Sequence, residues 1–461
     1  MIATQWEALT APIAGLAAAE QLTADFDRVL VSGLARLDDR QAAACTALAA
    51  AVAGSPLAAA VADAAEQVRA GTVGPEHLTA LAAARAAVSG AVHDALLEQC
   101  DSALGRKRAT AAPVPAAGPV PAAAVATRAW LTELAITGWQ GVGDDLLAAA
   151  DRTVESLLDE PSLRRSAVLV DGFAAELAAC VPVSAQPWVP VRRWADLWSR
   201  AVLSTWRATE SDGHGPAEPV SGRLLVLGTD IHEHGTAVQI QVHAILEQAG
   251  RPPRRVRIGV GAPKVATISG PAVWQLLGEH PRLLAALAEH RTLELTDMPA
   301  FPTGDLLWQD ERATAGEPAD PFTTATVALP QAVAPAAAPL DRDPVYIAEP
   351  ILLEGHQVSD GVARLGEHSI PLELDRLPAA GPLTPAAVNT AKAVLGLLRW
   401  DGGHWSIRPL AVRRTTKGEV VTLHNGDWAL GPVDPKAAKA QAKTGDPVAV
   451  LRERAGRLLR K

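Results

Sequence analysis

The chain has 461 residues, a formal net charge of −9, 48% hydrophobic residues and 20% charged residues. At roughly 150 residues per domain this length predicts about three domains, and the composition is that of a globular protein that buries a core. The acidic balance argues against bulk attraction to nucleic acid. Every apolar run is interrupted before the ~18 consecutive apolar residues that a membrane span requires.

The cysteines Cys45, Cys100 and Cys180 are far apart in the sequence and form no Cys-x-x-Cys pair. This spacing argues against a disulfide framework or a Cys-rich zinc site, and it is typical of buried thiols in a reducing compartment. The start of the sequence has neither the basic segment nor the continuous apolar segment of a signal peptide. We therefore expect a cytoplasmic protein without a membrane span.

The first half of the chain is predicted to be helical, in two modules. In residues 1–107 apolar side chains such as Leu30 and Leu34 recur at helical spacing, which indicates a helical domain. Residues 108–126 (RATAAPVPAAGPVPAAAVA) are rich in proline and alanine, and we expect an extended linker there. Helical spacing then resumes and predicts a second helical domain over residues 127–208.

From residue 221 the apolar period changes to two, as in β-strands. Residues 237–246 alternate apolar side chains with Gln239, Gln241 and His243, which predicts a strand with one polar face. Pro271 is suited to begin a helix that runs to Leu287. Further short strands are expected at 223–227, 256–260, 265–268 and 292–295. We assign residues 221–312 to an α+β domain and the proline-rich residues 313–343 to a second linker.

The last predicted domain, residues 344–432, is β-rich. Its strongest signal is a hairpin of residues 405–412 and 419–423 around a Thr-Lys-Gly turn. A helix is expected over 385–398, with strands at 345–348, 351–353 and 370–374. Residues 433–461 form a basic tail. The predicted fold class is multi-domain α+β, with two helical modules in the N-terminal half and a β-rich, mixed α/β C-terminal half.

The segment Asp230-Ile-His232-Glu-His234-Gly is the sharpest candidate for chemistry. Side chains alternate along a strand, so a His-x-His pair at its end places both imidazoles on one side. Together with Asp230 they predict a divalent-metal site that would generate hydroxide at neutral pH. Metal-dependent amidohydrolases open with a similar pattern, but their barrel needs alternating strands and helices that the following residues do not predict. The alternative is a polar hairpin tip with solvated histidines.

A second candidate is a tryptophan- and arginine-rich helix that begins near residue 191. Trp194 and Trp198 lie one turn apart, beside Arg193 and Arg200. Tryptophan and arginine dominate binding hot spots, so an exposed face of this kind would bind a protein partner. The alternative is that the tryptophans anchor the core of a helical domain.

The basic tail is a third candidate. Its lysines and arginines exceed its acidic residues, and Val450, Leu451, Leu458 and Leu459 interleave with them. Such a tail would attract nucleic acid, an anionic membrane face or an acidic partner. No recognisable RNA- or DNA-binding signature accompanies it, and a solubilising tail is the alternative.

Residues 192–206 (RRWADLWSRAVLSTW), with RWDGGHW at 399–405, resemble uncharacterised accessory proteins found with MoxR-type AAA+ ATPases, von Willebrand A domain proteins and SWIM zinc-finger proteins in high-GC bacteria. The chain has no Walker motif, no Asp-x-Ser-x-Ser motif and no SWIM cysteine pattern. The resemblance therefore implies a non-catalytic member of such a system.

Three functions are consistent with these patterns. The first is an adaptor or scaffold that acts through protein–protein contacts and uses no cofactor. The second is a metal-dependent hydrolase that uses Asp230, His232 and His234. The third is a nucleic-acid-binding protein that uses the basic tail.

Overall fold

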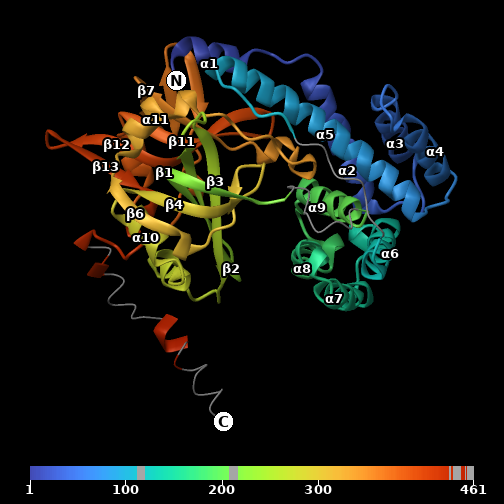
Figure 1. Ribbon diagram of the computed structural model, residues 1–461. Coiled ribbons are helices and arrows are strands. Elements are labelled where there is room, and N and C mark those ends of the chain that lie inside the picture. Colours follow the sequence, from blue (N-terminus) through green and yellow to red (C-terminus); the bar gives the residue numbers. More distant parts are fainter. Residues whose placement is uncertain (112–119, 207–215, 436–437, 440–447, 452, 454–461) are drawn as a thin grey trace.

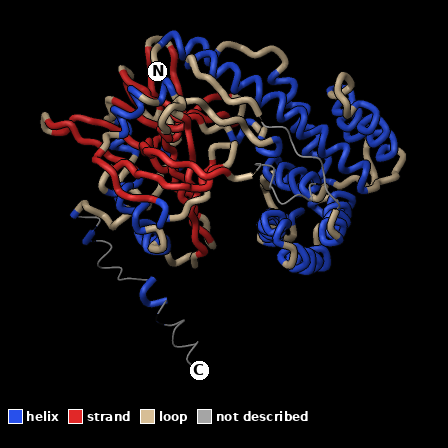
Figure 2. The backbone as a smooth tube through the Cα atoms, in the orientation of Figure 1, coloured by secondary structure: helices blue, strands red, loops and turns tan. Residues whose placement is uncertain are grey.

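The computed structural model describes residues 1–111, 120–206, 216–435, 438–439, 448–451 and 453. Figure 1 shows a helical N-terminal half beside a C-terminal half built on sheets, and Figure 2 shows the same division by secondary structure. The predicted α+β class, with helices first and strands later, is confirmed.

The boundaries of several helices follow from the sequence. Helix α3 begins after Asp38, whose carboxylate accepts from the Gln41 N–H at 2.8 Å while the Gln41 side chain accepts from the Asp38 N–H at 2.8 Å. This reciprocal capping box satisfies two N–H groups that a helix start leaves unpaired. The helices of this half are α1 (Ala3–Thr10), α2 (Leu16–Ser32), α3 (Asp39–Ala51), α4 (Ala58–Arg69), α5 (Pro75–Leu104), α6 (Ala122–Thr137), α7 (Asp144–Leu158), α8 (Arg164–Ala178) and α9 (Val191–Ser204).

The two predicted helical modules share one hydrophobic core, which runs from Phe26 in α2 to Val202 in α9. The ends of α2 and α6 meet at Gly33 and Gly138, where a Cβ on Gly138 would lie 2.3 Å from the Gly33 nitrogen. Both glycines have positive φ, so glycine meets the steric and the conformational requirement together. The predicted linker 108–126 is corrected at its end, because α6 already begins at Ala122; residues 112–119 lie outside the described residues.

Helix α5 joins the two halves. Its first turns pack in the helical core through Leu78 and Leu81, while Leu96 and Cys100 pack in a core shared with the sheets. By length and composition α5 could cross a membrane, but 67% of its most apolar window is buried inside the protein. It is therefore a core helix in this fold.

The first sheet contains six strands in the order β1-β2-β3-β5-β4-β6, and β1 also pairs with β4. The strands are β1 (Glu218–Glu233), β2 (Ala237–Glu247), β3 (Arg254–Pro263), β4 (Arg291–Ala300), β5 (Asp305–Leu306) and β6 (Ala313–Pro318). The predicted strand at 265–268 is wrong: the Lys264 ammonium donates to the Ile268 carbonyl at 2.9 Å and closes a turn. The predicted helix from Pro271 is interrupted and becomes a 3-10 helix over Gly270–Leu277 and α10 (Pro281–Ala288).

The predicted linker 313–343 is an ordered strap. It contains β6, α11 (Pro321–Val327) and several 3-10 turns, and Phe322 is buried. Its backbone bonds to both halves: the Ala334 N–H donates to the Lys107 carbonyl at 2.9 Å, and the Arg255 N–H donates to the Val333 carbonyl at 2.9 Å. Pro321, Pro330 and Pro339 occupy first turns of short helices, where proline is tolerated, so the abundance of proline did not signal an unstructured segment.

The second large sheet has the order β13-β12-β11-β7. The predicted hairpin is confirmed as β12 and β13, with positive φ at Lys417 and Gly418 in the turn. The predicted helix 385–398 is wrong beyond α12 (Pro385–Asn389), because an apolar strand buried between two neighbours lacks the period-two signal. The strands are β7 (Glu349–Glu354), β11 (Ala393–Asp401), β12 (His404–Thr416) and β13 (Glu419–His424), beside a small sheet of β8 (Gln357–Ser359), β9 (Val362–Leu365) and β10 (His368–Pro371).

Indole groups tie this sheet to the helices. The Trp405 indole donates to the Leu9 carbonyl at 3.1 Å, and the Trp400 indole donates to Glu20 at 2.7 Å. The two halves are therefore packed together at one end, through α1, α2 and α5. A cleft lies between them.

Candidate functional site

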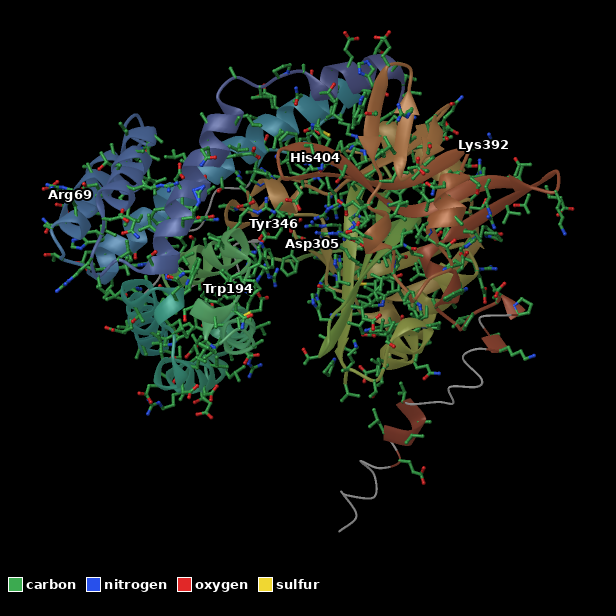
Figure 3. All side chains as sticks on the ribbon, turned by 180° about the vertical axis from the view of Figure 1, so that it is seen from behind. Arg69, Trp194, Asp305, Tyr346, Lys392 and His404 are labelled. Carbon is green, nitrogen blue, oxygen red and sulfur yellow. The ribbon has the colours of Figure 1, made fainter. Side chains whose placement is uncertain are left out.

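The cleft has a volume of about 1720 Å³ and is walled by α9 and the loop before it on one side and by β1, β2 and β3 on the other. Figure 3 shows Tyr346 and Asp305 at the boundary between the helices and the sheets. Pockets for small molecules usually measure ~300–1,000 Å³. The cleft is therefore large enough for a segment of a macromolecule.

The polar face that the sequence predicts for residues 237–246 lies in this cleft. Gln239 pairs across the strands with His232, Gln241 with Asp230, and His243 with Arg257. All of these side chains line the cleft. Among the described residues, neither Gln239 nor Gln241 has a side-chain hydrogen-bond partner.

The buried end of this face holds polar atoms without partners. His243 is 2% exposed and its Nε2 has no hydrogen-bond partner in the described part of the chain. Burial lowers the pKa of His243 to about 4, so the imidazole is neutral at pH ~7. The Nε of the buried Arg255 also has no hydrogen-bond partner among the residues that the structure describes. Buried polar groups are normally satisfied, and both of these residues belong to the lining of the cleft.

Asp230 lies at the centre of a network on the sheet side. Arg408 donates to both of its oxygens, at 3.0 and 3.3 Å, and His232 Nε2 lies 3.0 Å from it. Burial alone would raise the pKa of Asp230, but His232 and Arg408 outweigh burial and hold it below its usual range. Arg408 also donates to Glu373 at 3.0 Å. The carboxylate of Asp230 is thus ionised at pH ~7 and held by a guanidinium.

The three residues of the predicted metal site do not come together as one group. The structure brings Asp230 and His232 together, and His234 also lines the cleft. Over the described ranges, however, no group of three or more His, Cys, Asp or Glu side chains is arranged to hold a metal ion. His234 is exposed at the turn between β1 and β2, as the hairpin-tip alternative describes, whereas Asp230 is buried.

A second network forms the floor, around Glu349. Arg255 lies 2.5 Å from its carboxylate, Arg106 3.1 Å and Arg108 3.3 Å. Burial would raise the pKa of Glu349, but the three guanidinium groups reverse that effect and lower it. Three cations around one carboxylate leave this part of the cleft basic, even though Arg108 also pairs with Asp101.

On the helical side of the cleft, the structure corrects the prediction that the tryptophans of α9 form a partner-binding surface. Trp194 and Trp198 are fully buried in the helical core, where their indoles donate to Glu176 and to the Leu131 carbonyl, so the core alternative describes them. Arg193 is exposed and pairs with Glu176 at 2.5 Å. Arg200 donates to Asp341 of the strap at 2.8 Å and to Tyr346, just after the strap, at 2.6 Å.

The exposed tryptophan of the cleft is Trp188, at 76% exposure, in the proline-rich loop before α9. On the sheet side Leu307 is 52% exposed and also lines the cleft. An exposed indole in a cleft is a recognised feature of binding sites.

Sequence patterns did not identify the arginines of the sheet side. Arg255, Arg376, Arg399 and Arg408 come from four separate segments, and only the fold brings them to one cleft. The sequence also gave no indication of a role for Tyr346, which follows the segment 313–343 that was expected to be a linker. The signals of this wall that the sequence did show were the alternation of Gln239 and Gln241 and the segment that contains Asp230 and His232.

We found no match for this chain among protein-family models, curated proteins or solved structures.

Proposed function

We propose that the protein is a non-catalytic adaptor that holds a segment of a partner protein in the cleft between its two halves. The observation that carries the proposal is the cleft itself, whose volume of about 1720 Å³ exceeds that of a small-molecule pocket. Exposed apolar side chains support it on both walls, with Trp188 on the helical side and Leu307 on the sheet side.

The ionisation of the carboxylates in the cleft favours a binding function over a catalytic one. Asp230, Glu349 and Asp305 each accept from an arginine in the cleft, with Asp305 bound by Arg257 at 2.8 and 2.9 Å. A general acid or base needs a pKa near the working pH. The pKa values of Asp230 and Glu349 are instead held low, so these groups keep their charge and fix the arginines in place.

The proposal is tested with tagged protein purified from its host. The parent chain should retain a stoichiometric partner, and Trp188→Ala should lose it. Trp206→Ala is the matched control, because Trp206 is 39% exposed and does not line the cleft. Equal retention by both variants, with both folded by circular dichroism, would contradict the proposal.

A hydrolase is the second candidate, and the contact between Asp230 and His232 at 3.0 Å favours it. A buried carboxylate that orients an imidazole is the arrangement of a general base. Metal analysis of untagged protein beside His232→Ala/His234→Ala decides whether a metal takes part: near-stoichiometric zinc, manganese or iron in the parent alone would favour the hydrolase over the adaptor.

We also propose a cytoplasmic location and, from the resemblance of residues 192–206, a role beside an AAA+ ATPase system. Cys45 and Cys100 are buried, and burial raises their pKa to about 11 and about 12, as suits inert thiols in a reducing compartment. Nucleic-acid binding by the tail remains the third candidate; most of its basic residues lie outside the described residues.

A further inference from the structure

The charge of the cleft differs from that of the whole chain. The chain has a formal net charge of −9, yet the cleft is lined by ten arginines and seven carboxylates. Several partners of these arginines, such as Glu176 and Glu373, do not line the cleft. The guanidinium groups therefore face the cleft in excess of the carboxylates.

The excess is concentrated near Asp230. Arg376 is exposed and lines the cleft, and its guanidinium makes no hydrogen bond or ion pair at contact distance with the described residues. Arg399 donates to the Val345 carbonyl at 3.3 Å, and its buried Nε lies 3.5 Å from Glu373 without a hydrogen bond. Burial and the neighbouring Arg408 lower the pKa of Arg399, as expected where cations crowd together. An added carboxylate would relieve this crowding and satisfy open donors.

The glutamines suit an extended chain. Gln239 and Gln241 are two residues apart on β2 and point to the same face, so their Cα atoms are about 6.8 Å apart. An extended peptide repeats its peptide groups on one side at the same spacing. Each carboxamide has both a donor and an acceptor, which matches the N–H and C=O of a backbone. Asp230 connects this row to the arginines, because it pairs across the strands with Gln241 and is bound by Arg408.

We infer that the cleft binds an extended, acidic peptide segment of the partner, with a carboxylate of that segment at Arg376 and Arg399 and its backbone along Gln239 and Gln241. This inference rests on the proposed function and adds the chemistry of the occupant. A nucleic acid fits less well, because it carries a phosphate at every nucleotide.

The test measures fluorescence anisotropy of the full chain with three labelled probes: an alternating Glu-Thr peptide, the matching Gln-Thr peptide and a single-stranded DNA. The Glu-Thr peptide should bind at least about tenfold more tightly than the Gln-Thr peptide, as for the loss of a charge-assisted hydrogen bond. Arg376→Gln should abolish that preference. Arg364→Gln is the matched control, because Arg364 is exposed on β9 and does not line the cleft.

Other outcomes overturn the inference in distinguishable ways. Equal binding of both peptides, lost in Trp188→Ala but not in Arg376→Gln, would refute the acidic occupant and leave the adaptor proposal standing. Binding of the DNA alone, with a steep salt dependence, would assign the arginines to nucleic acid. No binding of any probe, together with retention of a host partner by Arg376→Gln, would also refute the acidic segment.

Discussion

The ion pair between Asp27 and Arg85 gives the sharpest prediction about stability. Arg85 Nε and Nη2 donate to the two Asp27 oxygens at 2.6 and 2.9 Å, and both side chains are 2% exposed. The Arg85→Met variant would leave the carboxyl buried without its cation. Its least costly response is to bind a proton, because burial already raises the pKa of Asp27.

The size of the effect follows from the pH. Protonating a carboxyl with an ordinary pKa of ~3.9 costs roughly 1.36 kcal/mol for each pH unit above that value, which is about 4 kcal/mol at pH ~7 and about 1.5 kcal/mol at pH ~5. A raised pKa in the folded state stabilises the fold below the unfolded value and loses that effect as the pH rises. The variant should therefore be less stable than the parent by about 4 kcal/mol at pH ~7 and by clearly less at pH ~5.

The assay is urea unfolding of the parent and the variant at both pH values, followed by circular dichroism. Asp27→Leu/Arg85→Met is the control, because replacing both partners of a buried pair by apolar groups is often neutral. It should recover most of the lost stability and should not show the extra dependence on pH. A loss below about 1 kcal/mol in Arg85→Met that is the same at both pH values, as for an exposed pair, would refute the reasoning.

Three further predictions concern other parts of the fold. Trp198→Ala should lower the free energy of unfolding by about 3–5 kcal/mol, measured by urea unfolding, because it empties a fully buried site. Trp188→Ala should change stability by less than about 0.5 kcal/mol in the same assay, because that indole is 76% exposed. Burial lowers the pKa of His243 and of His424 to about 4, so the parent should lose stability as the pH falls from ~6.5 towards 4, where the unfolded chain takes up protons first. His243→Gln should show a shallower decline in unfolding experiments across that range.

Short sequence patterns correctly predicted the elements whose structure depends on residues close together in the sequence. The hairpin of β12 and β13 follows from alternation and a Lys-Gly turn, and the polar face of β2 was visible as Gln239, Gln241 and His243. The strand β11 was expected to be helical, because burial between β7 and β12 removes alternation from its sequence. The strap was expected to be a linker, because its order comes from contacts with residues as distant as Lys107.

The candidate site depends on long-range contacts to a greater degree. Asp230 and His232 were recognised because they are neighbours in sequence, but Arg408, which binds Asp230, lies far along the chain. No short pattern could place Arg376 and Arg399 near it. Trp194 and Trp198 were recognised from the sequence, but their helical spacing is equally consistent with a buried core and with an exposed surface. Only packing against α6 and α8 shows that they belong to the core.

Site-specific photo-cross-linking tests the central claim most directly. A photoactivatable residue at Leu307, inside the cleft, is compared with one at Val420, which is 68% exposed on β13 and outside the cleft. The adaptor account predicts a single cross-linked partner from position 307, attached through an acidic segment that mass spectrometry identifies, and none from position 420. Cross-links from position 420 alone, or the same products from both positions, would contradict it.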